Sequence, residues 1–142
     1  MQYDSMEQCD NLNYGSTKQI CYGYFAAKEN NLNFCQERFK DEKDNCANCW
    51  QGKTSSIQDC VAGYAIYKND VSFCNQFEDI GEEASHLFKQ RCLSEYYIAK
   101  KEINMCKELK NKYIKGGCED RVTFSRENAL IIKYANWRGY LK

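Results

Sequence analysis

Cysteine is the residue type with the most chemical potential in this 142-residue chain, since a thiol can form a disulfide, bind a metal or attack a substrate. Cys46 and Cys49 form a C-x-x-C pair, a spacing that suits thiol–disulfide exchange or half of a zinc site. Exchange needs a βαβ context and zinc needs a second pair, and the sequence predicts neither. We expect structural disulfides, with a redox pair at Cys46 and Cys49 as the alternative. The ten cysteines are Cys9, Cys21, Cys35, Cys46, Cys49, Cys60, Cys74, Cys92, Cys106 and Cys118.

Few other residues suggest catalysis. His86 is the only histidine, and no Ser or Cys forms a recognisable catalytic motif with it, so we expect a surface side chain and not a general base. Gly116 and Gly117 lack the Lys-Ser/Thr that follows a phosphate loop, and they predict a helix C-terminus and a turn. The sequence therefore predicts no catalytic, cofactor-binding or metal-binding residue and a protein that is not an enzyme.

The spacing of the cysteines predicts the elements that carry them. Cys21 to Cys35, Cys60 to Cys74 and Cys92 to Cys106 each enclose thirteen residues. Each interval has an aromatic residue four positions after its first cysteine and an aliphatic residue three positions before its second. Chemistry and spacing recur together, which is typical of a stacked repeat, and the apolar residues follow a helical period. Each unit is predicted to be a helix, a tight turn and a second helix.

Polar residues mark the predicted turns and caps. The residues expected to end the first helices are Asn30, Asn31, Asn69 and Asp70. The residues expected to cap the second helices are Asn33, Ser72 and Asn104, with Gln36 completing a capping-box-like pair. The chain contains no proline, so none interrupts a helix.

Helix geometry limits which cysteines can pair. Thirteen intervening residues that are mostly one helix hold two cysteines about 15–20 Å apart, whereas the α-carbons of a disulfide lie within about 7 Å. The gaps between the equal intervals cross turns and can close. The pairs expected are Cys9–Cys21, Cys35–Cys46, Cys49–Cys60, Cys74–Cys92 and Cys106–Cys118, although Cys46 and Cys49 are helix neighbours that can exchange partners.

Composition indicates why such bonds are needed. Leu, Ile, Val and Phe make up only 26 of the 142 residues, so short helices here bury a thin apolar core. Persistent disulfides imply an extracellular or cell-surface setting, with the cytoplasm of a hyperthermophile as the alternative. Residues 1–7 are polar and acidic and do not form a signal peptide, which leaves open whether Met1 is the native start. No stretch predicts a transmembrane segment.

The C-terminal segment differs from the rest in charge. Residues 1–106 carry a net charge of −5 and residues 107–142 a net charge of +5. The last helix also has an apolar stripe, whose simplest interpretation is packing onto the final repeat. The sharper hypothesis is a self-complementary end through which copies associate head to tail. The candidate interface is Leu130, Ile131, Tyr134, Trp137, Arg138, Tyr140 and Leu141.

The segment Cys60-…-Tyr64-Ala65-Ile66-…-Asp70-Val71-Ser72-Phe73-Cys74 and its two copies resemble the Cys-x13-Cys α-helical repeats of cysteine-rich secreted proteins from small-genome archaea and candidate bacterial phyla. The resemblance implies architecture and no activity.

Together these observations predict one all-α domain over residues 1–142, made of disulfide-stapled αα-hairpins in a short solenoid-like or curled bundle. A half-unit spans residues 1–20, the repeats about 21–118 and a capping helix 119–142. The expected function is an extracellular or cell-surface interaction protein, which self-assembles into an oligomer or filament. The alternatives are a monomeric secreted binding module or effector, and a redox protein. The partner expected is a protein, with no cofactor. With a net charge of zero we expect no nucleic acid.

Overall fold

The computed structural model describes residues 6–12, 15–44, 52–81 and 83–127, and these residues form helices joined by turns. The elements in chain order are α1 (Met6–Asp10), α2 (Gly15–Lys28), α3 (Asn33–Arg38), α4 (Lys53–Lys68), η1 (Val71–Gln76), η2 (Ala84–His86), α5 (Phe88–Lys100), α6 (Ile103–Cys106) and α7 (Lys112–Glu127), where η marks a 3₁₀-helix. No strand occurs in these ranges, although Asp79 and Leu87 form an isolated bridge. The all-α, disulfide-containing fold class is confirmed.

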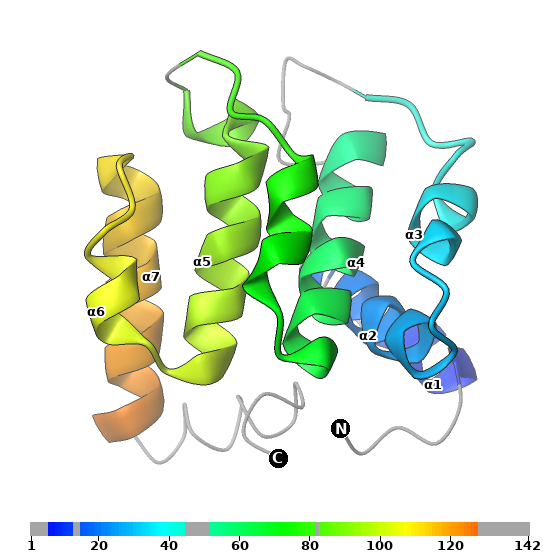
Figure 1. Cartoon of the computed structure of the whole chain (residues 1–142), viewed down its shortest axis with the longest axis horizontal. Helices are drawn as coiled ribbons and strands as arrows, with labels where there is room; N and C mark the ends of the chain where they lie inside the picture. Colours follow the sequence, from blue (N-terminus) through cyan, green and yellow to red (C-terminus); the bar gives the residue numbers. More distant parts are fainter. Residues whose placement is uncertain (1–5, 13–14, 45–51, 82, 128–142) are drawn as a thin grey trace.

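Helix α4 is the centre of the fold. Its residues Ser55–Ile66 are all buried, so every side of this part of the helix faces protein. Helix α4 packs against α2 and α5, and α5 packs in turn against α7 (Figure 1). The four long helices therefore follow one another in chain order, and the short segments α3, η1 and α6 lie in the connections between them.

Two glycines allow α2 and α4 to touch backbone to backbone. A Cβ atom on Gly23 would lie 2.0 Å from the carbonyl oxygen of Cys60, and one on Gly63 would lie 2.2 Å from that of Ile20. Only a residue without a side chain fits at either position. The contact brings the middle of α4 directly against the middle of α2, at Ile20 and Gly23.

Three of the long helices end in the same way. Asn30, Asn69 and Lys101 have φ values of 51°, 54° and 57°, in the left-handed region that closes many helices. At each end, two backbone N–H groups donate to carbonyls of the last turn, as in the 3.0 Å bond from Asp70 N to Ala65 O. The helix ends predicted at Asn30 and Asn69 are confirmed.

The predicted N-caps of the second helices are wrong. The residues that precede α3, η1 and α6 are Leu32, Asp70 and Glu102, and not Asn33, Ser72 and Asn104. The left-handed turn brings the chain back so sharply that each short helix begins within three residues of it. Only Asp70 caps through its side chain, and Ser72 is the donor there, at 3.0 Å from its N to Asp70 Oδ1. No side chain caps α3, so the capping pair with Gln36 is also absent there.

The glycine pair before Cys118 lies inside a helix and does not end one. Helix α7 begins at Lys112, earlier than the residue 119 expected for the last helix, and runs through Gly116 and Gly117. Asn111 starts the helix, since its Oδ1 accepts from the backbone N–H groups of Tyr113 and Ile114 at 3.0 and 3.1 Å. The cap formed by the Asn111 side chain thus favours a helix here, although Gly116 and Gly117 both have low helix propensity.

Four disulfides join the described helices: Cys9–Cys21, Cys35–Cys60, Cys74–Cys92 and Cys106–Cys118, with α-carbons 5.6 to 5.7 Å apart. Three of these are among the predicted pairs. The fourth overturns two predictions, since Cys35 and Cys60 bond to each other and not to Cys46 and Cys49. Helix α3 packs directly on α4, and the bond joins these two helices. Cys46 and Cys49 lie outside the described residues.

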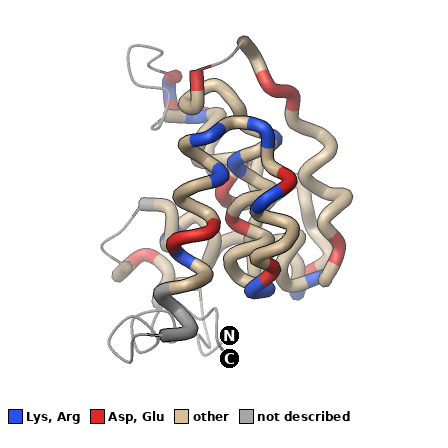
Figure 2. The backbone as a smooth tube through the Cα atoms, turned by 90° about the vertical axis from the view of Figure 1, so that its left-hand side faces the viewer, with Lys and Arg blue, Asp and Glu red and all other residues tan. Residues whose placement is uncertain are grey.

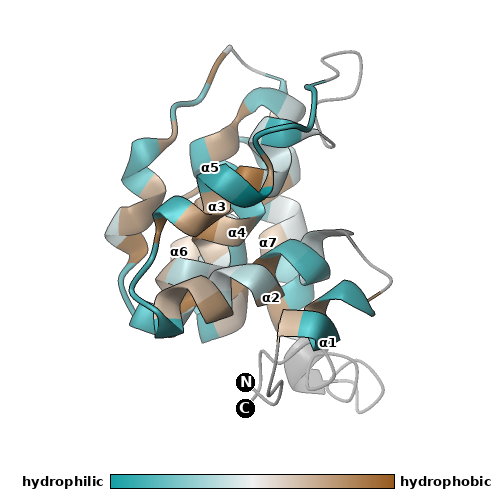
Figure 3. Ribbon diagram, turned by 90° about the vertical axis from the view of Figure 1, so that its right-hand side faces the viewer, coloured by the Kyte–Doolittle hydropathy of each residue, from teal (hydrophilic) through white to brown (hydrophobic). Residues whose placement is uncertain are grey.

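The disulfides lie in the apolar interior. All eight bonded cysteines are at most 2% exposed, and they belong to two hydrophobic clusters, one around α2 and α4 and one around α5 and α7. In Figure 3 the connection after α3 is strongly hydrophilic, and Lys40 to Asp44 are all charged. Among the described helices, none has the length and apolar character needed to cross a bilayer.

Candidate functional site

Several residues singled out in the sequence lie where the structure gives no description. Cys46, Cys49 and the whole candidate interface from Leu130 to Leu141 are outside the described residues. His86 belongs to η2 and is half-buried, with Nδ1 3.8 Å from Glu83 Oε2. It lines a hollow of about 380 Å³ together with Phe77, Ile80 and Phe88. In the described part of the chain, His, Cys, Asp and Glu side chains form no cluster of three suited to a metal ion.

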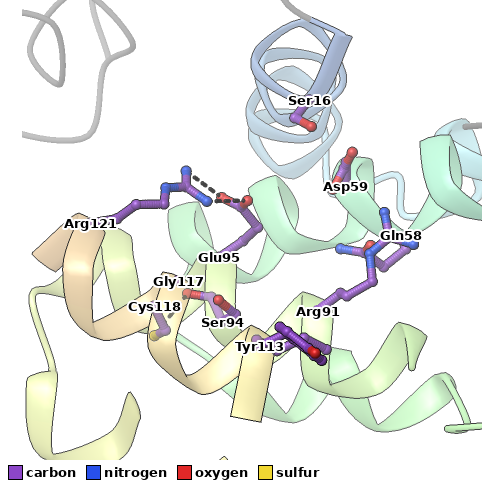
Figure 4. A pocket seen from close by; sticks show the side chains of 11 residues that line it. Ser16, Gln58, Asp59, Arg91, Ser94, Glu95, Tyr113, Gly117, Cys118 and Arg121 are labelled. Atoms are coloured by element: carbon purple, nitrogen blue, oxygen red, sulfur yellow. Dashed lines mark hydrogen bonds and ion pairs between the residues drawn. The ribbon is translucent and has the colours of Figure 1, made fainter. Parts of the chain in front are cut away.

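A more polar pocket lies between the central helix α4, α5, α7 and the first turn of α2 (Figure 4). Its volume is about 280 Å³. The polar and charged side chains that line it are Ser16, Gln58, Asp59, Arg91, Ser94, Glu95, Tyr113 and Arg121. We call this hollow the central pocket. In Figure 4 the side chains of Ser16 and Asp59 point toward one another, and Glu95 reaches toward Arg121.

The pocket exists because the first half of α4 is both polar and buried. Ser55, Ser56, Gln58 and Asp59 are each 7% exposed or less, whereas the second half of the helix buries mostly apolar residues. Polar groups are buried at a cost in free energy unless they find partners, so such a run needs a specific reason. The neighbouring helices supply partners for some of these side chains.

Two arginines enter the pocket from different helices and are held by protein groups. Arg121 of α7 binds Glu95 of α5 through two hydrogen bonds, of 2.9 and 3.4 Å. Arg91 donates from Nη2 to Ser55 Oγ at 2.7 Å and from Nη1 to the Ser85 carbonyl at 3.2 Å. The two guanidinium groups are therefore fixed in place. Around them, Figure 2 shows basic and acidic positions mixed along this side of the described chain.

Asp59 is the ionisable group that burial perturbs most. Loss of water around the carboxyl raises its pKa from 3.8 to about 7, and the negative charge of Glu95 acts in the same direction. Arg91, a hydrogen bond from Ser16 and Arg121 act in the opposite direction and do not outweigh burial. Near neutral pH this carboxyl therefore exchanges between its protonated and ionised forms.

Gln58 is the second unusual group. Its side chain is fully buried, and neither Oε1 nor Nε2 has a hydrogen-bond partner in the described structure. A buried polar group without a partner costs about 1–3 kcal/mol, so two such atoms on one side chain are expensive. Gln58 borders the pocket but is 0% exposed, so both polar atoms lie beneath the surface of the pocket.

The chemistry available in the central pocket is recognition of a small polar molecule, with one carboxyl that can gain or lose a proton. Ser16 and Ser94 line the pocket, but His86 lies in the separate hollow beside Phe77, so no described histidine activates either hydroxyl. We therefore treat the central pocket as a binding site.

The sequence predicted no role for the polar and charged residues of this pocket, although one signal was present. A glutamine lies two positions before the first cysteine of each thirteen-residue interval, at Gln19, Gln58 and Gln90. These glutamines lie outside the thirteen-residue intervals, so the agreement between the intervals does not include them. The pattern marks the right position on each helix, but it does not tell which glutamine lacks a partner.

No protein-family model matches the chain, and no curated protein or solved structure matches it either.

Proposed function

We propose that this chain is a non-enzymatic binding protein that acts outside the reducing cytosol, with the central pocket as its binding site. The observation that supports this proposal is a hollow of about 280 Å³ lined by a fully buried amide without a partner and a buried carboxyl. Ligand sites typically combine a concave surface with a few converging polar groups of perturbed pKa.

The proposal is tested by titrating small molecules into the oxidised, isotope-labelled full chain and following amide signals by NMR. A panel of small amines, alcohols and carboxylates covers the charges that the pocket can accept. We expect at least one compound to cause saturable shifts centred on Gln58 and Asp59 of α4 and on facing residues of α5 and α7. The absence of saturable shifts from every compound at millimolar concentration would refute the proposal.

The proposed location outside the cytosol rests on the disulfides. Each of the four links residues 12 to 25 positions apart, and closing a loop of about 15 residues contributes about 3 kcal/mol in the chain-entropy model. A small protein with a thin apolar core gains much of its stability from such bonds, and only an oxidising compartment, or a hyperthermophile cytoplasm, preserves them. Peptide mapping under non-reducing conditions is expected to recover the four observed pairs, and eight free thiols at these positions would exclude this location.

We also propose that the helices are stacked copies of one repeating unit. The shared left-handed helix ends support it, and so do two equivalent contacts: Lys68 Nζ donates to Asn30 Oδ1, and Lys100 Nζ donates to Asn69 Oδ1. In both, a lysine at the end of one long helix binds the asparagine that closes the preceding one. A contact that recurs from unit to unit is what a solenoid requires.

Head-to-tail self-assembly is the second candidate function, supported by the opposite net charges of residues 1–106 and 107–142. Analytical ultracentrifugation at low and high salt tests it, since charge-driven association weakens as salt rises. A strict monomer at high concentration and low salt would contradict it. The redox alternative at Cys46 and Cys49 is tested by an insulin-reduction assay. If the natural chain does not accelerate the reduction of insulin, that hypothesis is wrong.

A further inference from the structure

We infer that the hollow beside His86 accepts the C-terminal segment of a second copy of this chain, with Trp137 as the inserted side chain. This inference rests on head-to-tail self-assembly, the second candidate function, because it names the two surfaces that meet. Three features of the described chain carry it: the lining of the hollow, the fixed position of Ile80 and the direction of α7. We call this site the aromatic hollow.

The aromatic hollow combines an apolar lining with acidic side chains. Phe77, Ile80 and Phe88 supply the apolar lining, and the volume of about 380 Å³ equals that of about thirteen water molecules at about 30 Å³ each, which accommodates an indole ring. Asp44 and Glu78 also line the hollow, whereas no lysine or arginine of the described chain does. Neither carboxylate forms an ion pair with a described basic side chain. The hollow therefore suits a bulky apolar group with a positive charge beside it.

The two acidic side chains have different roles. The carboxylate of Asp44 accepts from the backbone N–H of Thr54 at 2.8 Å and from the Thr54 hydroxyl at 2.6 Å. Thr54 lies in the first turn of α4, whose positive dipole end compensates the charge of Asp44. Glu78 is exposed and lies outside the described helices. Glu78 is therefore the acid that meets a basic group at the hollow.

The backbone around Ile80 holds this side chain in the solvent. Ile80 is 63% exposed, although it is a large apolar residue. Its backbone N–H donates to the His86 carbonyl at 3.2 Å. Asp79 beside it accepts from both N and Nε2 of Gln90, each at 3.2 Å. An apolar side chain that is fixed in water at the border of an apolar hollow indicates an interaction surface.

The chain itself contains a segment of complementary chemistry. Residues 128–142 include Lys133, Arg138 and Lys142 and no acidic residue. They also include the candidate interface, in which Trp137 directly precedes Arg138. Tryptophan and arginine are among the residue types that most often dominate the binding energy of an interface. Trp137 therefore enters the apolar lining of the hollow, and Arg138 meets Glu78.

The direction of α7 explains why the occupant is a second copy. Helices α5 and α7 run side by side in the same direction: near their starts, Gln90 Oε1 accepts from Asn111 N at 2.8 Å. Farther along, Glu95 Oε1 accepts from Arg121 Nη1 at 2.9 Å. The hollow includes Phe88 at the start of α5, whereas the C-terminal segment follows the opposite end of α7 (Figure 1). A donor and an acceptor at opposite ends of one chain give a heterologous contact, which joins copies head to tail.

The test is a complementation experiment on the oxidised full chain, followed by analytical ultracentrifugation at low salt. We expect the natural chain to form species larger than a dimer as its concentration rises. Ile80→Lys removes an apolar contact and repels the basic segment, so it is expected to weaken association by about tenfold or more, and Trp137→Ser to do the same. An equimolar mixture of the two variants is expected to form a dimer and nothing larger, because one intact hollow and one intact segment remain.

Two further variants separate the hollow from general effects of charge. Tyr67→Lys makes a similar change at a side chain that is 42% exposed near the other end of α4, and it is expected to leave association unchanged. Glu78→Gln is expected to weaken association about two- to fivefold at low salt and to have no effect at high salt, because salt screens the pair with Arg138. Because Glu78 is exposed, this variant keeps the test decisive even if Ile80→Lys does not fold.

The outcomes separate this inference from self-assembly itself. A natural chain that stays monomeric at high concentration and low salt would overturn both. Association that is unchanged in Ile80→Lys and Glu78→Gln would overturn the hollow as the acceptor and leave head-to-tail assembly standing. A natural chain that stops at a dimer, or a mixture of variants that forms none, would overturn the heterologous contact. If Trp137→Ser shifts the amide NMR signals of Phe77 and Phe88 in a monomeric chain, the segment of the same copy occupies the hollow, and the second copy is excluded.

Discussion

Replacing Asp59 with Asn is expected to make the stability of the protein less sensitive to pH. Asp59 has a pKa of about 7 in the folded chain, against 3.8 for an exposed aspartate, because burial disfavours the ionised carboxylate. The folded state therefore holds the proton more tightly than the unfolded state. The resulting stabilisation is complete below pH about 4 and is lost as pH rises toward 7. Asparagine has nearly the same shape and no proton to lose, so the variant lacks this loss.

The two pKa values determine the size of the effect. Linkage gives a total loss of about 4 kcal/mol between acidic pH and pH 8, of which about 2–3 kcal/mol falls between pH 5 and pH 8. The free energy of unfolding of Asp59→Asn, relative to the natural chain, is therefore expected to rise by about 2–3 kcal/mol over that interval. Other ionisable groups titrate in both proteins, and their contributions cancel in this difference.

Urea denaturation of both oxidised proteins at pH 5 and pH 8 measures this difference, provided that the m-values agree. Asp120→Asn is the control, because Asp120 is an exposed acid on α7 and its replacement is expected to change stability by less than about 0.5 kcal/mol at either pH. A difference between Asp59→Asn and the natural chain that is the same at both pH values would refute the reasoning. It would mean that water reaches the carboxyl well enough to keep it ionised.

Five further substitutions test the packing and the pocket by urea denaturation. Gly63→Ala is expected to destabilise the fold by about 1–3 kcal/mol or more, since its Cβ would lie 2.2 Å from a carbonyl oxygen of α2. Gly116→Ala is the control: its Cβ would have no neighbouring atom within 4 Å, so it is expected to stabilise α7 by about 0.5–1 kcal/mol. Equal effects would contradict the close crossing. Lys101→Gly is expected to gain about 0.5–1 kcal/mol, because residue 101 has a φ of 57°, and a loss would contradict the left-handed helix end. Gln58→Leu is expected to stabilise the free protein by about 1–2 kcal/mol, whereas Gln90→Leu, which breaks two hydrogen bonds, destabilises it. Destabilisation by both would show that water already satisfies Gln58.

The disulfides show how far helix geometry alone predicts this fold. Cys9–Cys21 and Cys106–Cys118 are separated by 12 residues, and a turn between two helices is the simplest way to bring such residues together. The same reasoning failed for Cys35 because it assumed that the next cysteine in sequence is the next in space. The true partner, Cys60, lies 25 residues away and begins an interval like the others. Treating Cys46 and Cys49 as an insertion between units would have given the observed pair.

Sequence patterns could not predict the central pocket, for a physical reason. Asp59, Arg91, Glu95 and Arg121 come from three helices, and each alone is an ordinary charged residue on a helix of mixed character. Burial of Asp59 depends on how closely α2 and α4 approach, and that distance is set by glycines which carry no chemical signal of their own. Whether Gln58 finds a partner depends on its neighbours in space. Periodicity predicts which residues share a helix face, but not which buried groups stay unsatisfied.

The same bonds that replace a large apolar core also explain how a small protein can hold such a pocket. Asp59 directly precedes Cys60, Arg91 precedes Cys92, and Gly117 precedes Cys118, so α4, α5 and α7 are each held by a disulfide directly beside a residue that lines the pocket. A buried carboxyl and an unsatisfied amide favour unfolding, and covalent links offset this cost by restricting the unfolded chain. They also hold the backbone beside the polar groups, which lowers the reorganisation needed on binding. Reduction is therefore expected to abolish ligand binding together with the fold.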